Sequence, residues 1–387
     1  MLVYRHGVSV CRKRMADILR IFILANYDMG LYKFRRELME ELKREHEVFF
    51  CVPNGEYVEQ IKALGCQYVP CHYLNRHGKN PFIDLKLLKY YQRCIKEICP
   101  DVVLTYTVKP NVYGGIACAM ARIPYIATIT GLGAAIENGG ATKKIVSRLY
   151  RMGLKKAHAV FFQNKRDFRF FSEHRIVSGR SALVPGSGVN TDYHALMPYP
   201  ADTNGLVFST VGRIMRGKGC MELAEAARQV KQKHPETRFR MIGFFDEDCP
   251  VQLKGAISSG VLEHIENQQD VRPVYAESHA IIHPSYYEGM SNVLLEAAAT
   301  GRPVLASNIP GCREAFDEGV SGIGFEQKNV DDLVRAIEEF IALPYEQKAA
   351  MGLAGREKVK REFDRKIVVD AYMREIRKVE ESRHTAL

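Results

Sequence analysis

The stretch 283–301, HPSYYEGMSNVLLEAAATG, constrains the fold of this 387-residue chain more than any other. The apolar residues 280–282 in front of it predict the end of a buried strand. Residues 293–299 favour a helix, and Gly301 followed by Pro303 is a helix stop signal. A buried strand, a loop and a helix in this order predict an α/β unit.

The loop inside this stretch joins a helix N-terminus to two acidic residues. Ser291 or Asn292 is expected to be the N-cap, and free backbone N–H groups make such an N-terminus an anion site. Glu288 and Glu296 would be separated by a rise of ~12 Å if the segment were fully helical, which is about the span of a nucleotide sugar. A carboxylate at each end could then accept hydroxyl hydrogen bonds around a diphosphate. Spacing alone also fits two solvated helix carboxylates.

The pattern Pro-Ser-x-x-Glu-Gly-x-x-x-x-x-Leu-Glu-Ala resembles the signature of the family-four retaining glycosyltransferases of GT-B fold. The resemblance implies two facing, Rossmann-like, doubly wound domains with a cleft between them. It also implies that Glu288 holds hydroxyls of the donor sugar and that Glu296 holds the ribose. The donor-binding residues expected between them are Gly289, Met290, Ser291 and Asn292.

Length and composition fit a globular protein of two domains. Hydrophobic residues make up 46% of the chain, but no apolar run reaches the ~18 residues of a membrane span. Ten cysteines occur without a Cys-x-x-Cys pair, which indicates reduced thiols in a cytosolic protein. Residues 1–14 are basic and patternless, and we expect a disordered extension there.

The net charge of +10 is concentrated in residues 141–180, which hold eleven Lys or Arg and two acidic residues. Phe161, Phe162, Phe168, Phe170 and Phe171 lie in the same window. Basic and aromatic residues together suggest an anionic membrane surface or a polyanion, although a solvated helix face is also possible. Nucleic acid is disfavoured because no reading motif is present.

Strand and helix patterns alternate through the first half of the chain, which predicts a doubly wound parallel sheet. We expect strands at 18–24, 47–52, 68–73, 102–106 and 125–130, and helices at 31–44, 57–64 and 83–98. The first loop, 26–30, lacks Gly-x-Gly-x-x-Gly, so dinucleotide binding has no support. The family resemblance implies that Gly30 in this loop faces the cleft.

Two further segments, 107–111 and 129–133, resemble a subgroup that builds bacterial surface glycans on polyprenyl-diphosphate carriers, with N-acetylgalactosaminyltransferases among its members. This likeness places Lys109, Thr130 and Gly131 at the acceptor or the cleft. Many family members have a histidine where Thr130-Gly131 stands, so a catalytic histidine is not expected here.

A Gly-rich loop with cations, 212–220, follows the strand expected at 206–211. Glycine lets a backbone approach phosphate closely, and arginine can contact two phosphate oxygens at once. The family resemblance assigns Arg213 and Lys218 to the nucleotide diphosphate, with Gly212 beside them. The Gly-Lys-Ser/Thr ending of a Walker loop is absent. The acidic residues 246–248 are interpreted as a solvated loop, and no metal is expected.

The expected domains are 15–190 for the acceptor and 205–360 for the nucleotide sugar, with a linker at 191–204 and a final helix, 361–387, that returns to the first domain. The function predicted from the resemblance is retaining, metal-independent transfer of a hexosyl unit, either N-acetylhexosamine or galactose, from a UDP-sugar. The acceptor is a polyprenyl-diphosphate-linked glycan of capsule, O-antigen or protein-glycan synthesis. No resident cofactor is expected, and no general base is assigned.

The expected location is the cytoplasmic face of the plasma membrane, with peripheral attachment through residues 141–180. Two alternatives also fit the sequence. One is a UDP-N-acetylglucosamine 2-epimerase-like enzyme of the same fold, which would act without an acceptor. The other is a non-catalytic subunit that binds nucleotide sugar or membrane. The sequence leaves open the donor sugar, the acceptor linkage and the oligomeric state.

Overall fold

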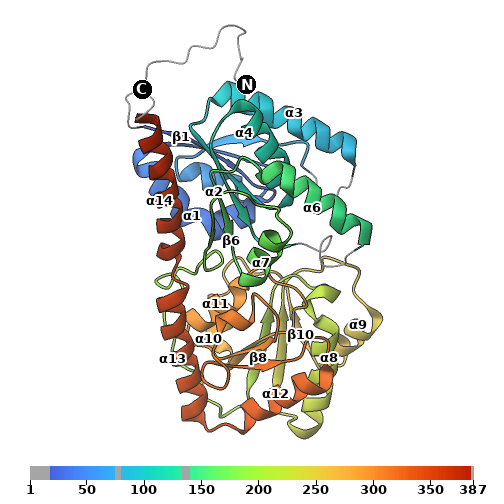
Figure 1. Ribbon diagram of the computed structural model, residues 1–387. Coiled ribbons are helices and arrows are strands. Elements are labelled where there is room, and N and C mark those ends of the chain that lie inside the picture. The colour runs from blue at the N-terminus through green and yellow to red at the C-terminus, as the bar shows by residue number, and fades with distance from the viewer. Residues whose placement is uncertain (1–17, 75–79, 133–139, 385–387) are drawn as a thin grey trace. The chain divides into compact units, whose positions relative to one another are not determined.

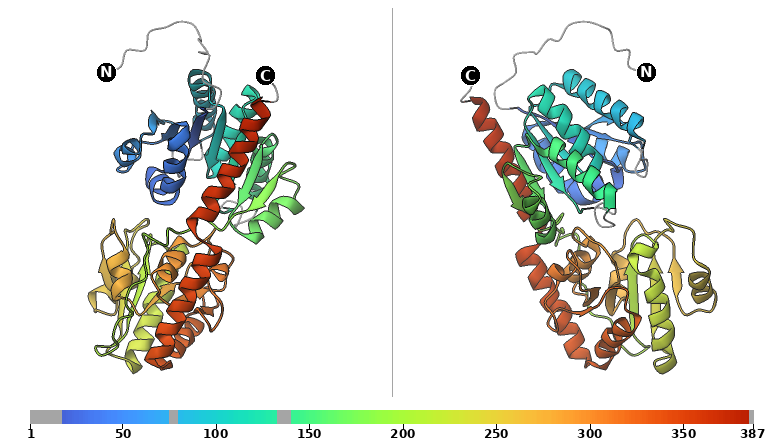
Figure 2. Two further views of the ribbon diagram at one scale, coloured as in Figure 1. Left: turned by 90° about the vertical axis from the view of Figure 1, so that its left-hand side faces the viewer. Right: turned by 45° about the vertical axis from the view of Figure 1, so that its right-hand side comes forward.

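The computed structural model describes residues 18–74, 80–132 and 140–384 and divides the chain into two compact units. Unit 1 comprises Met1–Val184 and Val369–Leu387, and unit 2 comprises Pro185–Val368. The extension expected at 1–14 lies outside the described residues. Helices cover both faces of the parallel sheet in each unit (Figures 1 and 2).

Unit 1 contains a seven-stranded parallel sheet in the order β3-β2-β1-β4-β5-β6-β7. Its strands are β1 (Arg20–Leu24), β2 (Glu47–Val52), β3 (Gln67–Pro70), β4 (Val102–Tyr106), β5 (Tyr125–Ile129), β6 (Ala159–Phe162) and β7 (Ser181–Leu183). Its helices are α1 (Asp28–Glu45), α2 (Val58–Ala63), α3 (Pro81–Ile98), the π-helical η1 (Pro110–Gly114), α4 (Gly115–Ala121), α6 (Gly140–Leu154) and α7 (Lys165–Glu173). Strands β4 and β5 are fully buried, as continuous apolar runs in a parallel sheet usually are.

Helix α14 (Arg365–His384) ends in unit 1, where it packs on the sheet. The hydroxyl of Tyr372 is hydrogen-bonded to Oγ1 of Thr128, and its ring meets that of Phe161 edge to face at 4.9 Å. Arg383 forms an ion pair with Asp101 at 3.1 Å. Helix α14 therefore contributes Tyr372 to the core of unit 1 and Arg383 to its surface.

Unit 2 contains a six-stranded parallel sheet in the order β10-β9-β8-β11-β12-β13. Its strands are β8 (Val207–Val211), β9 (Arg238–Ile242), β10 (Glu263–Ile265), β11 (Ala280–His283), β12 (Val304–Ser307) and β13 (Gly322–Phe325). Its helices are η2 (Arg216–Lys218), α8 (Cys220–Lys233), α9 (Val251–Ser258), α10 (Arg272–Glu277), α11 (Asn292–Ala299), η3 (Arg313–Ala315), α12 (Val330–Ala342) and α13 (Tyr345–Glu362). One apolar core forms with α8, α9 and α12, and a second forms with α11.

Helix α1 begins earlier than the sequence suggested. We expected a loop through Gly30, but the helix starts at Asp28 and includes Gly30 in its first turn. The carboxylate of Asp28 is buried and accepts a hydrogen bond from the backbone N–H of Tyr57 at 2.7 Å. An acidic residue in the first turn also interacts favourably with the helix dipole. A contact from a distant segment thus fixes the start of this helix.

Residues 191–204, expected to be a linker, are part of unit 2, and two buried or half-buried arginines of this unit bind them. Arg302 is fully buried and donates hydrogen bonds to the carbonyls of Met197 and Pro198. Arg356 donates to the carbonyl of His194 at 3.1 Å. The side chains of Arg302 and Arg356 therefore hold a segment whose composition is typical of a linker.

Candidate active site

The candidate site lies in unit 2 at the carboxyl ends of β8 and β11, which are neighbouring parallel strands. Loops that follow such strands meet at one edge of the sheet, where α/β proteins bind ligands. The hydroxyl of Thr210 near the end of β8 donates to the carbonyl of Ile282 in β11 at 2.9 Å. The two strands thereby bring the cationic loop 212–219 beside the loop 284–291.

The cationic loop can approach its neighbour because of one glycine. Gly219 has φ +68°, and a Cβ at this position would lie 2.1 Å from the carbonyl oxygen of Pro284. The backbone N–H of Tyr286 also donates to the carbonyl of Gly217 at 3.0 Å. Only glycine fits such a close approach of two backbones, so the two loops pack directly against each other.

Glu288 is the centre of a charged cluster at these loops. Its Oε1 contacts Nζ of Lys218 and lies 2.8 Å from Nε2 of His283. Only 14% of the Glu288 side chain is exposed. Burial alone would raise the pKa of Glu288, but the Lys218 charge and the His283 hydrogen bond outweigh it and hold the pKa well below its ordinary value. Glu288 is therefore ionised at neutral pH.

Both of these contacts use the same oxygen of Glu288. Its other oxygen, Oε2, has no hydrogen bond to any residue that the structure describes. A carboxylate can accept hydrogen bonds at each oxygen. The arrangement thus holds the carboxylate in place through one oxygen and leaves the second able to accept hydroxyl groups of a ligand.

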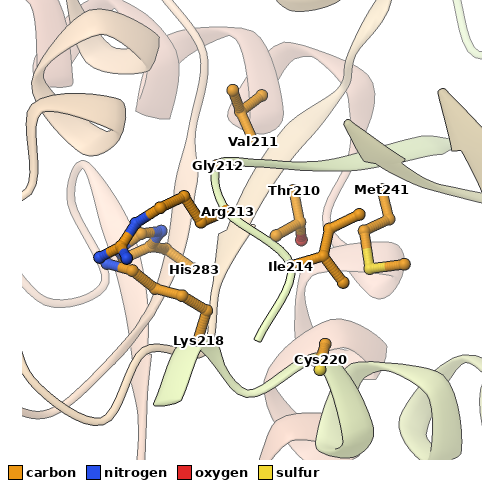
Figure 3. A pocket seen from close by; sticks show the side chains of 9 residues that line it. All are labelled: Thr210, Val211, Gly212, Arg213, Ile214, Lys218, Cys220, Met241 and His283. Atoms are coloured by element: carbon orange, nitrogen blue, oxygen red, sulfur yellow. The ribbon is translucent and has the colours of Figure 1, made fainter. Parts of the chain in front are cut away.

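Arg213 lies beside Lys218 and His283. The three side chains line one small cavity, and Figure 3 shows their nitrogen atoms gathered together beside the loop after β8. Arg213 forms an ion pair with Asp246, and 32% of its side chain is exposed. Two cationic side chains and a histidine gathered together have the chemistry to bind an anion such as a diphosphate.

One residue of the acidic loop after β9, Asp246, is less exposed than the sequence suggested. Asp246 is paired with Arg213, and Glu247 accepts a hydrogen bond from the backbone N–H of Arg216 at 3.1 Å. The interpretation as a solvated loop is therefore wrong for Asp246, because the fold places β9 next to β8, and it is confirmed for Glu247 and Asp248, which are exposed. Among the residues described, no cluster of three or more His, Cys, Asp or Glu could hold a metal ion.

Ser291, one of the two expected N-caps, caps α11 by accepting a hydrogen bond from the backbone N–H of Leu294 at 3.4 Å. Helix α11 begins at Asn292, so Glu288 and Gly289 lie in the loop before it and the segment 288–296 is not a single helix. Gly311 packs against this loop and accounts for its non-helical path. A Cβ at position 311 would lie 2.8 Å from the carbonyl oxygen of Glu288, and the carbonyl of Gly311 accepts a hydrogen bond from the backbone N–H of Ser291.

The remaining donor-site candidates differ in their surroundings. The side chain of Met290 is buried against Gly186, so only its main chain can face a ligand. Glu296 accepts a hydrogen bond from the hydroxyl of Tyr275 at 2.9 Å. Burial, followed by the charge of Glu296, raises the pKa of Tyr275 well above its ordinary value, so the phenol stays protonated and orients the carboxylate.

The candidates for the acceptor or cleft, Gly30, Lys109, Thr130 and Gly131, all belong to unit 1. Lys109 follows β4 and forms an ion pair with Asp84 at 2.8 Å. Thr130 and Gly131 follow β5, the strand next to β4. Within unit 1, these three residues therefore lie at the carboxyl edge of the sheet, the edge at which α/β sheets bind ligands.

Two protein-family models match the chain. Residues 198–358 match the model for glycosyl transferases group 1, and residues 20–164 match the model for glycosyl transferase 4-like proteins. The chain is a family-four glycosyltransferase. As a glycosyltransferase of GT-B fold, it has the two Rossmann-like domains expected from the sequence.

The relatives of this glycosyltransferase include two enzymes with lipid-linked substrates in their names. It is 25% identical over 374 residues to the N,N'-diacetylbacillosaminyl-diphospho-undecaprenol alpha-1,3-N-acetylgalactosaminyltransferase of Campylobacter jejuni, covering 92% of this chain and 98% of the relative. It is 24% identical over 271 residues to the UDP-Gal:alpha-D-GlcNAc-diphosphoundecaprenol alpha-1,3-galactosyltransferase of Escherichia coli, covering 66% of this chain and 70% of the relative.

Among solved structures, the glycosyltransferase is similar to Anabaena HepE in complex with UDP and glucose. The TM-score is 0.74 with 16% identity, and the match covers 92% of this chain and 99% of that one. In the described part of this glycosyltransferase, no helix has the length and apolar character needed to cross a membrane.

Sequence reasoning did not assign three residues to the candidate site of this glycosyltransferase. His283 was visible only as a polar residue that ends a buried strand. Gly243 has φ +151°, and a Cβ there would lie 1.7 Å from the Gly212 carbonyl oxygen, so it allows the loops after β8 and β9 to touch. Asp246 and Arg213 are 33 positions apart, and nothing local in the sequence links them.

Proposed function

We propose that this glycosyltransferase transfers a hexosyl unit from a UDP-sugar to a polyprenyl-diphosphate-linked glycan and retains the anomeric configuration. The observation that carries this proposal is the cluster of Arg213, Lys218 and His283 around ionised Glu288, next to the N-terminus of α11. Such a site combines donors for a diphosphate with a carboxylate for sugar hydroxyls, and it lies in one domain.

The cations act on the leaving group. When the bond between the anomeric carbon and the diphosphate breaks, negative charge grows on the departing phosphate oxygens. Arg213, Lys218 and the free N–H groups of α11 stabilise that charge, because charge-assisted hydrogen bonds in a preorganised site favour the transition state. With these groups on the diphosphate, the reaction needs neither a metal ion nor a resident cofactor.

The two glutamates hold the sugars of the donor. Oε2 of Glu288 accepts hydroxyl groups of the transferred hexose, while Lys218 and His283 fix the carboxylate through Oε1. Glu296, oriented by Tyr275, accepts hydroxyl groups of the ribose. The departing phosphate oxygen takes the proton of the acceptor hydroxyl, so that attack and departure occur on the same face of the sugar.

The names of the relatives support the choice of substrates. The Campylobacter jejuni and Escherichia coli relatives form alpha-1,3 linkages on sugars attached to undecaprenyl diphosphate, and one of them uses UDP-Gal. We infer a UDP-N-acetylhexosamine or UDP-galactose donor for this chain. The acceptor is a lipid-linked sugar of surface polysaccharide or protein-glycan synthesis.

Helix α6 supports a location at the inner face of the plasma membrane. Ile145 and Met152 are 60% and 55% exposed on this helix, with Lys144, Arg148 and Arg151 around them. Apolar and basic side chains on one exposed face are typical of helices that rest on anionic lipid. The phenylalanines of the basic window contribute less than the sequence suggested, because Phe161, Phe162 and Phe171 are buried in the core.

A donor panel tests the proposal. Purified protein is incubated with UDP-N-acetylgalactosamine, UDP-N-acetylglucosamine or UDP-galactose, with and without EDTA, and UDP release is measured before and after a lipid-diphosphate acceptor is added. We expect slow release of UDP from one of the donors. This release should be insensitive to EDTA and should become faster when the acceptor is added. Turnover to an epimer without acceptor, or no binding of any donor, would contradict the proposal.

A further inference from the structure

The loop after β9 is joined to the cationic loop by main-chain hydrogen bonds. The N–H of Ile214 donates to the carbonyl of Phe244 at 2.8 Å, and the N–H of Asp246 donates to the carbonyl of Ile214 at 3.1 Å. These bonds extend the pairing of β8 and β9 past the ends of the strands. The main chain of Asp246 is therefore held beside the residue that follows Arg213.

The carboxylate of Asp246 uses this fixed position to bind Arg213. Its Oδ2 contacts Nη1 of Arg213, and 17% of the Asp246 side chain is exposed. A guanidinium has five N–H donors in a planar fork, so one contact at Nη1 leaves the others able to bind a phosphate. Figure 3 shows the end of the Arg213 side chain directed toward the nitrogen atoms of Lys218 and His283.

We propose that Asp246 is a positioning residue for Arg213 in donor binding. It holds the guanidinium beside Lys218, so that the remaining N–H groups meet the diphosphate without first having to be ordered. This inference rests on the proposed function, because it requires the diphosphate to bind at Arg213. It gives the acidic loop a role through Arg213 and not through a metal ion.

An alternative role for Asp246 is that of an internal anion that competes with the phosphate for Arg213. The main-chain hydrogen bonds argue against it, since they keep Asp246 from moving away when a ligand arrives. The two roles also predict opposite results. Removal of a competitor tightens donor binding, whereas removal of a positioning residue weakens it.

The test compares Asp246→Ala, Asp246→Asn and Asp248→Ala by calorimetric titration with UDP and with uridine. Asp248 is the matched control, because it carries the same charge in the same loop and is exposed. We expect Asp246→Ala to weaken UDP binding about tenfold, within the range of couplings between contacting side chains. Uridine binding should be unchanged, and Asp246→Asn, which keeps an acceptor oxygen, should restore most of the UDP affinity.

A double-mutant cycle completes the test. In an Arg213→Ala background, Asp246→Ala should have no further effect on UDP binding. Three results for Asp246→Ala would overturn the inference without contradicting the proposed donor site. They are tighter UDP binding, equal losses of affinity for UDP and uridine, and an unchanged UDP affinity. Dependence of UDP binding on Mg²⁺ that Asp246→Ala abolishes would also overturn it. If Arg213→Ala alone leaves UDP binding unchanged, the proposed diphosphate site fails, and the inference falls with it.

Discussion

Nε2 of His283 lies 2.8 Å from Oε1 of Glu288, the same oxygen that Nζ of Lys218 contacts. A residue at the end of β11 and a residue in the loop after β8 thus fix one carboxylate between them. The position of Glu288 depends on the pairing of two strands and on a hydrogen bond with the last residue of the strand before its loop. This arrangement predicts effects on ligand binding, pH dependence and stability.

Replacement of Glu288 by alanine should reduce turnover far more than nucleotide binding. The carboxylate acts on the transferred sugar, so we expect kcat to fall by roughly 100-fold, the effect of removing one preorganised group. UDP affinity should change by less than about threefold, because the cations of the diphosphate site remain. Initial rates and UDP titration measure the two effects. Glu266→Ala, at an exposed position of unit 2, is the control and should leave both unchanged.

Loss of Lys218 should move the acid limb of the pH–rate profile to higher pH. Lys218 and His283 lower the pKa of Glu288 from its ordinary value of 4.5, so the ionised form persists in wild type as the pH falls below that value. Without the Lys218 charge, burial raises the pKa of Glu288, and the carboxylate becomes protonated at a higher pH.

The measurement for this prediction is kcat/KM against pH for wild type and Lys218→Met. The same sign holds for stability, since a carboxylate with a lowered pKa stabilises the folded state above its ordinary pKa and loses that contribution as the pH falls. An acid limb at the same pH in both proteins would show that Lys218 does not control the ionisation of Glu288. Lys231→Met, at a residue on α8, is the control.

Gly219→Ala should destabilise unit 2 and weaken donor binding together. A Cβ at this position would lie 2.1 Å from the Pro284 carbonyl oxygen, so the two loops have to separate. We expect a loss of about 2–4 kcal/mol in the free energy of unfolding, as for other strained or overpacked substitutions. Gly260→Ala is the matched control, because Gly260 also has a positive φ, +73°, but open space around its Cβ.

The control should lose only about 1 kcal/mol, the usual strain of alanine in this backbone conformation. Thermal unfolding and UDP titration of both variants measure the difference. Equal destabilisation by the two substitutions, with UDP affinity unchanged, would mean that close contact between the two loops is not needed for the site.

The exposed face of α6 should control attachment to anionic lipid. Ile145→Asp with Met152→Asp removes two exposed apolar side chains and adds negative charge, so we expect at least a tenfold loss of vesicle binding. Sedimentation with phosphatidylglycerol vesicles at low and high salt measures it. Phe82→Asp is the control, since Phe82 is 77% exposed on α3 and lies outside the basic window. If Phe82→Asp lost as much vesicle binding as the α6 variant, the binding would depend on exposed apolar side chains in general and not on α6.

The sequence predicted those parts of the site that depend on local patterns. The strand, loop and helix around 283–301 follow from an apolar run, an N-cap at Ser291 or Asn292, of which the structure shows Ser291, and a stop at Gly301. The cationic loop after β8 follows from its glycines and from Arg213 and Lys218. Such features are encoded by neighbours in the chain, so spacing and residue type are enough to find them.

The rest of the site depends on contacts between distant segments. Gly311 holds Glu288 outside α11, and Gly243 lets the Asp246 loop reach Arg213. No periodic pattern in the sequence marks either of these contacts, because the order of strands in the sheet creates them. The early start of α1 at Asp28 has the same cause, a hydrogen bond to the distant Tyr57.

The central claim is retaining transfer of a hexose from a UDP-sugar by the site around Glu288. The most direct measurement is proton NMR of the reaction with the preferred UDP-sugar and a lipid-diphosphate-linked acceptor, which reports the anomeric configuration of the product. We expect an alpha-linked product from the alpha-configured donor, in wild type and not in Glu288→Ala. A beta-linked product, or conversion of the donor to its epimer without acceptor, would contradict the claim.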